Sequence, residues 1–477
     1  MTRPFLKSLL LPLTLLGVNL ASAADPTPNI IFIFADDWGW EDLSCHNHPF
    51  VKTPNIDRLS KEGTEFTRFT VASPVCSPSR TAINTGQFSA RQLIDGHFAW
   101  ADSNKKRGMP DWLDTQAPSM PRILQTAGYR TAHYGKWHLS NEMIPDSPNP
   151  LAYGYDAYGA YNCSGEQMPY DKDVFHSINF IKKSVAEKRP FFINLWLHEP
   201  HTPFHVLPKY RQMFPHLTND GENIYAATLA YADERVGELL NYLDDNNLTE
   251  NTLVIFSSDN GPARSKKPVE VPTMMYDPST GLGFGNGASK GTTGGRKGYK
   301  GSLHEGGINV PFLARWPGKI KAGAIDTQSF ITAVDILPTF CSLAGAKLPE
   351  GYVPDGLDYT DVLLGTPAPE REKTIFSRYS AGSPKSEHWA SHTVISKGYK
   401  FLTNPKTKRT ELYHLVSDPL EKKDLAAEKA ELVTELKAEL DTWLTSLPTE
   451  HPAGVFSSLR NDPKALQKSK EPYRRYR

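Results

Sequence analysis

One cysteine of this chain stands in a run of residues that is typical of a reactive site. Cys76 begins the sequence Cys76-Ser-Pro-Ser-Arg80, directly ahead of the helix-compatible stretch Thr81 to Thr85. An unpaired cysteine is most often a small buried hydrophobe, but its neighbours here are Ser, Pro and Arg, which are not core residues. The pattern therefore predicts a chemically reactive side chain at position 76, with an arginine beside it.

One interpretation of this run is a thiolate nucleophile. Arg80 and a helix N-terminus would lower the pKa of the Cys76 thiol and so activate it. Cysteine phosphatases, however, place the arginine further along the chain, after a longer loop that cradles phosphate. The spacing between Cys76 and Arg80 therefore argues against a phosphatase of that class.

Acidic and amide side chains follow two apolar stretches of the chain. Asp36-Asp37 comes after the first, and Asp259-Asn260-Gly261 comes after the second. Either group alone is compatible with a turn or a helix cap. Together they supply four side chains with oxygen donors, which suit a hard cation such as Ca²⁺ or Mg²⁺. We predict a divalent cation site formed by both groups.

A set of basic side chains accompanies the acidic ones. Its members are Arg80, Lys136, His138, His198, His201 and Lys300. On its own, Lys136-Trp-His138 is compatible with packing plus a surface charge. His198 and His201 have the spacing of a zinc pair, but Pro200 prevents the continuous helix on which zinc hydrolases align two histidines. Zinc is therefore the less favoured interpretation.

The elements that must position these groups alternate between strands and helices. Three apolar stretches predict buried strands, and each ends in polar residues: Asn29 to Phe34, Phe191 to Leu197 and Leu253 to Phe256. Helical patterns lie between them, at Pro54 to Glu62, Met120 to Ala127 and Ile224 to Leu243. This alternation predicts an α/β fold, a large and mainly parallel sheet sandwiched by helices. Ligands bind at the carboxyl ends of such strands, so we expect the polar groups to converge.

The pattern changes after about Asp355. Hairpin-like runs, His392 to Ser396 and Tyr399 to Thr403, precede an amphipathic helix from about Glu431 to Leu447. They predict a smaller C-terminal α+β subdomain of antiparallel strands packed with a helix. We expect a signal peptide at residues 1–23, a catalytic domain at 24–355 and the C-terminal subdomain at 356–477.

The first residues are typical of a secretory signal peptide. Arg3 and Lys7 precede the apolar run Leu9 to Leu20, and the small residues Ala21-Ser-Ala23 follow it. The apolar run is shorter than the roughly 20 residues that a membrane anchor needs. We therefore expect a secreted or periplasmic protein with no stable membrane span.

The run from Cys76 to Arg80 resembles the maturation signature of the type I sulfatases, Cys-x-Pro-Ser-Arg, whose cysteine is oxidised to formylglycine. Five further blocks are similar to that family and stand in its order. They are Phe32-Ile-Phe-Ala-Asp-Asp37, Tyr134-Gly-Lys-Trp-His138, His198-Glu-Pro-His-Thr-Pro203, Ser258-Asp-Asn-Gly261 and Lys300-Gly-Ser-Leu-His-Glu-Gly-Gly307. The resemblance extends from about Pro28 to Asp418-Pro419 and implies an alkaline phosphatase-like fold.

The resemblance also implies a role for each matched residue. A calcium ion, rather than Mg²⁺, would be held by Asp36, Asp37, Asp259, Asn260 and the modified Cys76. Arg80 and Lys136 would steady the formylglycine hydrate, and His138 would take a proton from it. Lys136, His201 and Lys300 would bind the sulfate oxygens, and the last two would assist the leaving oxygen. Sulfuryl transfer builds negative charge on these oxygens, where a metal and fixed cationic donors act.

The implied function is the hydrolysis of sulfate esters on a sulfated carbohydrate or a small aryl sulfate. A formylglycine-generating enzyme would mature the protein. Two alternatives remain: a phosphodiesterase or phosphonate monoester hydrolase with the same machinery, and a secreted sugar-binding pseudoenzyme in which Cys76 is never oxidised. The chain departs most from the family pattern at Gln87 to Pro118 and at Asp146 to Met168, which we expect to set substrate choice.

Aromatic and imidazole side chains could stack on a sugar ring, although burial in the core is the commoner role at each position. The candidates are Trp100, Trp112, Tyr155, Tyr158, Tyr161, His205 and Trp389.

Charge and cysteine content exclude other classes. Lysine plus arginine and aspartate plus glutamate both number 53, so no overall field attracts nucleic acid. We expect no nucleic-acid partner. The four cysteines are too few for a disulfide scaffold. If maturation consumes Cys76, the remaining three cysteines allow one disulfide bridge and one free thiol. The sequence does not decide whether that bridge forms.

Overall fold

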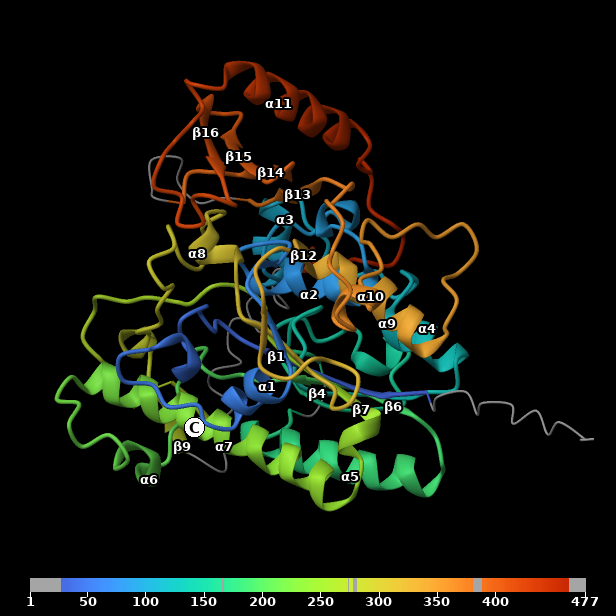
Figure 1. The fold of residues 1–477 in the computed structure, drawn as a ribbon, viewed down its shortest axis with the longest axis vertical. Helices are drawn as coiled ribbons and strands as arrows, with labels where there is room; N and C mark the ends of the chain where they lie inside the picture. Colours follow the sequence, from blue (N-terminus) through green and yellow to red (C-terminus); the bar gives the residue numbers. More distant parts are fainter. Residues whose placement is uncertain (1–26, 165–166, 273, 278–280, 381–387, 463–477) are drawn as a thin grey trace, which may run out of the picture.

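An eight-stranded sheet runs through the centre of the molecule in the order β11-β2-β10-β7-β1-β6-β4-β5 (Figure 1). The structure is a computed structural model that describes residues 27–462 except 165–166, 273, 278–280 and 381–387; the predicted signal peptide at 1–23 lies outside the described residues. The strands of this sheet are β1 (Asn29–Ala35), β2 (Thr64–Phe66), β4 (Arg130–Lys136), β5 (Ala157–Tyr161), β6 (Phe191–Trp196), β7 (Thr252–Ser258), β10 (Phe312–Arg315) and β11 (Ala324–Asp326).

The centre of this sheet is parallel. β1 pairs in parallel with β6 on one side and β7 on the other, and β4 pairs in parallel with β6 and β5. Only towards one edge does the direction change, where β10 is antiparallel to both β7 and β2. The predicted α/β fold with a large, mainly parallel sheet is confirmed.

Helices cover both faces of the sheet (Figure 1). Ile30, Phe32 and Phe34 of β1 belong to one hydrophobic core, whereas Ile31 and Ile33 belong to a second core. Successive side chains of a strand point to opposite faces, so a strand buried on both faces must be apolar throughout. The first core includes residues of α2 (Cys76–Thr85), α4 (Met120–Thr126) and α9 (Ile336–Ala344), and the second includes residues of α1 (Ile56–Glu62), α5 (Asp173–Ala186) and α7 (Asp220–Asp245).

Helix α2 begins earlier than expected. The sequence predicted helix from Thr81, but the structure begins it at Cys76 and ends it at Gly86, whose φ is 69°. Pro78 lies in the first turn, where its missing N–H would have no intrahelical partner anyway. The whole reactive-site run is therefore helical, and every residue of α2 is buried.

Shorter elements fill the connections. They are β3 (Phe69–Thr70), α3 (Ala101–Lys106), α6 (Pro208–Arg211), β8 (Met274–Asp277), β9 (Gly281–Gly283), α8 (Glu305–Ile308), β12 (Ile331–Thr332) and α10 (Thr360–Leu363).

The C-terminal part forms a separate four-stranded antiparallel sheet in the order β13-β14-β15-β16, with α11 beside it at the top of Figure 1. Its elements are β13 (Ile375–Arg378), β14 (His392–Ser396), β15 (Tyr399–Asn404), β16 (Arg409–His414) and α11 (Ala430–Thr445). Helix α11 buries Leu436, Leu440 and Trp443, which share one face at helical spacing. The predicted antiparallel sheet with a packed helix is confirmed; the division at residues 355 and 356 stays our proposal.

Ion pairs attach this small sheet to the segment from Lys297 to Glu305, which leads into α8. Glu411 accepts bonds from Lys297 Nζ at 2.9 Å and His304 Nε2 at 2.8 Å. Lys400 Nζ lies 2.9 Å from Glu305 Oε1 and 3.0 Å from a carboxylate oxygen of Glu421. These contacts hold both ends of the segment that carries Lys300.

Replacing Glu411 by glutamine should destabilise the protein in a pH-dependent way. Burial alone would raise the pKa of Glu411, but bonds from His304, Lys297 and Tyr413 outweigh it and hold that pKa well below its ordinary 4.5. A carboxyl group whose pKa is lower in the folded state than in the unfolded state contributes its full stabilisation above about pH 4.5. This contribution to the free energy of unfolding is lost as the pH falls towards the folded-state pKa. We expect Glu411→Gln to lower the free energy of unfolding by about 2 kcal/mol at pH 7, and by less at pH 3.

Denaturant unfolding at both pH values measures this effect. Glu435→Gln is the matched control, because Glu435 pairs with Lys397 on the surface and such pairs contribute little. An equal loss for Glu411→Gln at pH 7 and pH 3 would contradict the prediction.

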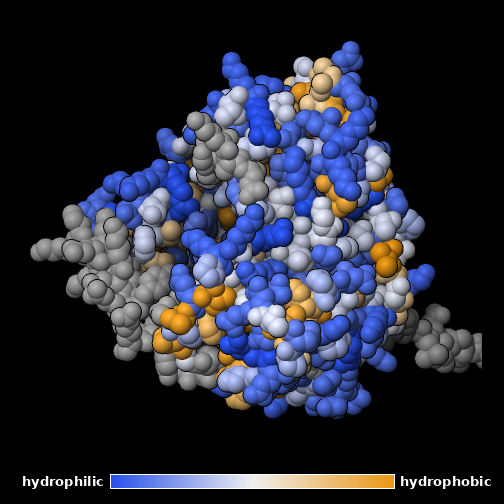
Figure 2. Space-filling model, turned by 90° about the vertical axis from the view of Figure 1, so that its left-hand side faces the viewer, coloured by the Kyte–Doolittle hydropathy of each residue, from blue (hydrophilic) through white to orange (hydrophobic). Residues whose placement is uncertain are grey.

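The surface and the cysteines complete the description. Over the residues that the structure describes, helices that are both long and apolar enough to cross a bilayer are absent. The face in Figure 2 is largely hydrophilic, with hydrophobic residues in small separate groups. All four cysteines are free, so the single bridge that the sequence left open is not formed.

Candidate active site

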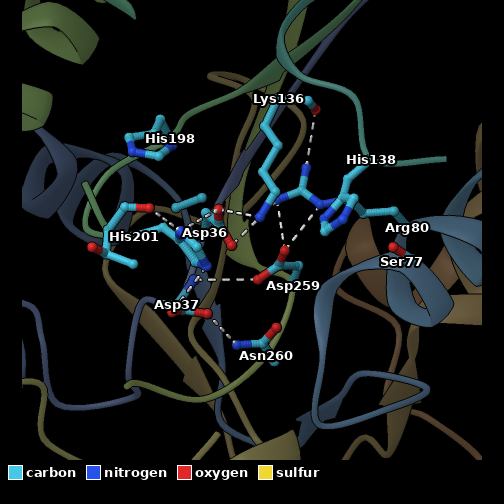
Figure 3. A network of polar contacts seen from close by, with 12 residues as sticks. Asp36, Asp37, Ser77, Arg80, Lys136, His138, His198, His201, Asp259 and Asn260 are labelled. Carbon is cyan, nitrogen blue, oxygen red and sulfur yellow. Dashed lines mark hydrogen bonds and ion pairs between the residues drawn. The ribbon is translucent and has the colours of Figure 1, made fainter. Parts of the chain in front are cut away.

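The register of two parallel strands brings the acidic residues together. Ala35 of β1 is the partner of Ser258 of β7, so Asp36 and Asp259, the next residues, leave the sheet side by side at its carboxyl edge (Figure 3). Asp37 N donates to Asp259 Oδ1 at 3.2 Å, and Asn260 Nδ2 donates to Asp37 Oδ1 at 2.7 Å. All four side chains are buried.

Helix α2 presents Cys76 and Arg80 to this acidic group. The two residues are four apart, so they share one face of the helix. Arg80 donates from Nε and Nη2 to Asp259 Oδ2 at 2.9 and 2.6 Å. Burial alone would lower the pKa of Arg80, but the carboxylates of Asp259 and Asp36 hold it above its ordinary value. Arg80 is therefore a fixed cation in a fully buried position.

Cys76 is buried beside two of the carboxylates. Its Sγ and one oxygen each of Asp36 and Asp259 lie within 4.8 Å of one another. Burial raises the pKa of the Cys76 thiol, although the charges of Lys136 and Lys300 oppose this. The unmodified side chain is thus a neutral thiol, which does not suit the thiolate interpretation of this run.

Two lysines neutralise the first two aspartates. Lys136, the last residue of β4, contacts Asp36 Oδ2 through its Nζ. Lys300 Nζ lies 2.6 Å from Asp37 Oδ1 and 2.7 Å from Asp37 Oδ2. The charges of Asp37 and Asp36 outweigh burial and raise the pKa of Lys300. Both ammonium groups therefore lie against carboxylates at the same end of the sheet.

The two histidines that follow β6 differ in position. His201 Nδ1 is 3.9 Å from Asp36 Oδ2, its Nε2 is 3.9 Å from Asp37 Oδ2, and its side chain is 25% exposed. His198 is buried and stacks on Tyr170, and its Nε2 donates a hydrogen bond to the carbonyl oxygen of Pro203 at 3.0 Å. His198, His201 and Asp36 also lie within 4.8 Å of one another. His201 is the histidine that solvent can reach.

His138 is arranged to accept a proton. Its Nε2 faces the carbonyl oxygen of Phe98 at 2.9 Å, so the ring is assigned with its proton on Nε2. Nδ1 is buried and has no hydrogen-bond partner among the described residues. Burial and the charge of Lys136 lower the pKa of His138 well below its usual range. The neutral ring therefore keeps a free lone pair on Nδ1.

Two buried oxygens of the acidic group fit a cation. Asp36 Oδ1 and Asn260 Oδ1 have no hydrogen-bond partner in the described part of the chain, and leaving buried acceptors unpaired is costly. Carboxylate and amide oxygens are the donors that Ca²⁺ and Mg²⁺ prefer. The predicted residues Asp36, Asp37, Asp259 and Asn260 therefore have the donor chemistry of a hard-cation site, with Cys76 at its edge.

Most of the predicted sugar-stacking side chains are not available. Five of the seven are buried: Trp112, Tyr155, Tyr161, His205 and Trp389. These rings pack against neighbouring side chains, as Tyr155 does against His133 and Trp137. The stacking prediction is wrong for these five, because residue type alone does not fix exposure; Trp100 and Tyr158 are partly exposed.

One wall of the site is the loop from Asp95 to Ala99, which lies in the Gln87 to Pro118 segment expected to set substrate choice, but no residue pattern predicted its contacts. Phe98 N donates to the Oγ of Ser77, the residue after Cys76, at 2.9 Å, and its carbonyl accepts the bond from His138. Both contacts use backbone atoms, which any residue type could supply.

Comparisons with known proteins agree with this geometry. The family model described as Sulfatase matches residues 28–346, and the one described as N-sulphoglucosamine sulphohydrolase, C-terminal, matches residues 297–447. The N-acetylgalactosamine-6-sulfatase of Canis lupus familiaris is 29% identical over 489 residues, which cover 90% of this chain and 87% of the relative. The N-acetylgalactosamine-6-O-sulfatase of Bacteroides thetaiotaomicron is 26% identical over 512 residues, or 88% of this chain and 93% of the relative.

Solved structures give the same result. The crystal structure of Ps i-CgsB in complex with k-i-k-neocarrahexaose matches with a TM-score of 0.72 and 27% identity over 93% of this chain and 100% of that one. The phosphonate monoester hydrolase of Agrobacterium radiobacter has a TM-score of 0.59 at 19% identity, covering 88% of this chain and 95% of its own. That second likeness concerns the fold alone.

Proposed function

The chain belongs to the sulfatase family, within the alkaline phosphatase-like superfamily, and is a sulfuric ester hydrolase; we propose that it removes sulfate from a sulfated carbohydrate outside the cytoplasm. The reaction would use formylglycine made from Cys76 and a bound calcium ion. One observation carries the proposal: the reactive-site run, two acidic strand ends and the lysines lie together in one buried cluster.

The lysines and His201 would bind the sulfate group. Lys136 and Lys300 hold two ammonium groups at the mouth of the acidic cluster, and His201 is the accessible ring beside them. Negative charge grows on the equatorial and leaving oxygens during sulfuryl transfer, so fixed donors at this point stabilise the transition state. We assign assistance of the leaving oxygen to His201 and Lys300.

Arg80 and His138 would act on the modified side chain at position 76. Arg80 is held by Asp259 one helical turn from Cys76, which keeps its charge beside the reacting side chain. His138 Nδ1 would accept a proton there, because that atom is neutral and uncommitted. When present, formylglycine as its hydrate supplies a nucleophilic hydroxyl with a second hydroxyl on the same carbon.

Asp36, Asp37, Asp259 and Asn260, together with the modified residue 76, would hold the calcium ion. The ion would supply positive charge next to the sulfate. The unpartnered oxygens of Asp36 and Asn260 support this assignment.

The relatives support a saccharide substrate. Two carry names that specify N-acetylgalactosamine 6-sulfate, and one solved structure holds a neocarrahexaose. The signal peptide predicted at residues 1–23 is consistent with an exported enzyme that meets such polymers, after maturation by a formylglycine-generating enzyme.

Rates on paired nitrophenyl esters test this function. We expect the mature enzyme to hydrolyse nitrophenyl sulfate at least about 10²-fold faster than nitrophenyl phosphate. The reason is that the charge and geometry of the site favour the transition state of sulfuryl transfer over that of phosphoryl transfer. Ion chromatography of sulfate released from a panel of sulfated saccharides identifies the natural substrate. A faster rate on a phosphodiester or phosphonate ester would instead support the phosphodiesterase alternative. An intact thiol at position 76 in protein from the native host, found by peptide mass spectrometry, would support the pseudoenzyme.

A further inference from the structure

The loop from Asp95 to Ala99 brings His97 next to the reacting position. Phe98, the neighbour of His97, is bonded to Ser77 on one side and to His138 on the other. The centroid of the His97 ring lies 6.4 Å from that of His138. His97 is exposed to solvent, unlike His138. It therefore lines the mouth of the site rather than its buried centre.

Arg107, the residue after α3, packs against the same loop. A Cβ atom added to Gly96 would lie only 2.8 Å from Arg107 Nη1, so glycine at this position lets the guanidinium approach the backbone beside His97. Arg107 Nε donates to the Ser103 carbonyl at 3.2 Å, and Nη2 donates to Asn104 Oδ1 at 2.9 Å. Both acceptors are uncharged.

Arg107 differs from the other arginines around the site because it has no carboxylate partner among the residues that the structure describes. Arg80 is paired with Asp259, and Arg378 is paired with Asp95. Among the described residues, no carboxylate forms an ion pair with Arg107, which is only partly exposed. A partly buried cation without a counter-charge is costly to maintain. It is also a ready partner for an anion that arrives with the substrate.

Arg107 and the lysines that we propose to bind sulfate both act electrostatically on His97. The surrounding protein and the charges of Arg107, Lys300 and Lys136 lower the pKa of His97 to about 4. His97 is therefore neutral at pH 7 and can donate or accept a hydrogen bond, while Arg107 supplies the positive charge.

Tyr379 lies near both this loop and the residue after Lys300. Ser380 N, next to it, donates to the Asp95 carbonyl at 2.8 Å. The Tyr379 hydroxyl lies 3.8 Å from the position of a Cβ added to Gly301, the residue after Lys300. The walls formed by Arg107, His97 and Tyr379 thus adjoin the lysine that would hold the reacting sulfate.

We propose that Arg107 and His97 form a binding position for a second anionic group of the substrate, a further sulfate or a carboxylate on the same or the adjoining sugar. This inference rests on the proposed function, because it assumes that Lys136, His201 and Lys300 bind the sulfate to be removed. Arg107 would pair with the second anion through Nη1, and His97 would add a hydrogen bond. The position lies in the Gln87 to Pro118 segment, which the sequence marked for substrate choice.

Competition against nitrophenyl sulfate hydrolysis tests the proposal. The competitors are N-acetylgalactosamine 6-sulfate, its 4,6-disulfate, and the disaccharide of glucuronate with N-acetylgalactosamine 6-sulfate. We expect at least one doubly anionic competitor to inhibit the enzyme at about tenfold lower concentration than the monosulfate, the gain typical of a charge-assisted contact. The disulfate and the glucuronate disaccharide separate a sulfate from a carboxylate as the second anion.

Arg107→Met should remove most of that advantage, since methionine keeps an unbranched side chain but no charge. Arg107→Lys should retain part of it. Lys106→Met is the matched control, because Lys106 is an exposed cation one residue away, and this variant should keep both the basal rate and the full advantage. An unchanged advantage in Arg107→Met, or equal inhibition of the unsubstituted enzyme by all three competitors, would overturn the proposal. Absence of nitrophenyl sulfate hydrolysis by the unsubstituted enzyme would count against the proposed function instead.

Discussion

Cys76→Ser should reduce turnover by at least about 10³-fold, the scale expected when the nucleophile of a catalytic group is lost. A serine side chain has one hydroxyl, whereas a hydrated aldehyde has two on the same carbon. Serine could accept a sulfuryl group once, but it has no second hydroxyl whose deprotonation would expel sulfate. The substitution is small and residue 76 is buried in α2, so the fold should persist.

Steady-state sulfate release and peptide mass spectrometry measure this effect together. Mass spectrometry establishes whether residue 76 of the unsubstituted protein is formylglycine or cysteine. Cys45→Ser is the matched control, since Cys45 is a free thiol outside the site and its replacement should leave the rate within about twofold. Multiple turnovers by Cys76→Ser at a rate near that of the unsubstituted enzyme would rule out the formylglycine mechanism.

Asp259→Asn should remove bound calcium and lower kcat/KM by at least about 10²-fold, because the metal and Arg80 both act through this carboxylate. Asp259 Oδ2 accepts two bonds from Arg80, while Oδ1 accepts from Asp37 N. Asparagine keeps the volume and one acceptor oxygen, so Arg80 is not left without a partner. Alanine at position 259 would leave the buried cation of Arg80 without this partner. A loss of metal could then not be told apart from a loss of folding.

Elemental analysis of the purified protein measures the metal directly, independently of activity. Asp233→Asn is the matched control, because Asp233 is also a buried carboxylate but caps the start of α1 through the amides of Asn55 and Ile56. It should lose stability and keep its calcium. Full calcium content in Asp259→Asn, with normal circular dichroism, would mean that the ion binds elsewhere.

The amino-acid sequence by itself determined three strands at the centre of the sheet and the polar residues at their carboxyl ends. Strands covered by helices on both faces must be apolar along their whole length, so the runs before Asp36 and Asp259 stand out from their neighbours. Polar residues then begin where each strand leaves the core. Because β1 and β7 are adjacent and parallel in the structure, the polar residues that follow these two strands meet at one edge of the sheet.

The start of α2 shows where local rules become ambiguous. The sequence marked only Thr81 to Thr85 as helix-compatible, although Pro78 is tolerated in a first turn. In the structure the helix extends from Cys76 to Thr85 and is buried along its whole length.

Only the tertiary structure decided which residues surround the site and which of its polar atoms have no hydrogen-bond partner among the described residues. The contacts of Phe98 use backbone atoms, and Arg107 reaches the loop because Gly96 lacks a side chain. Lys300 is steadied by Glu411 and Lys400, about a hundred residues further along the chain, through Lys297 and Glu305. No period or spacing in a sequence encodes such contacts, because they depend on which distant surfaces pack together and on which polar atoms that packing leaves unpaired.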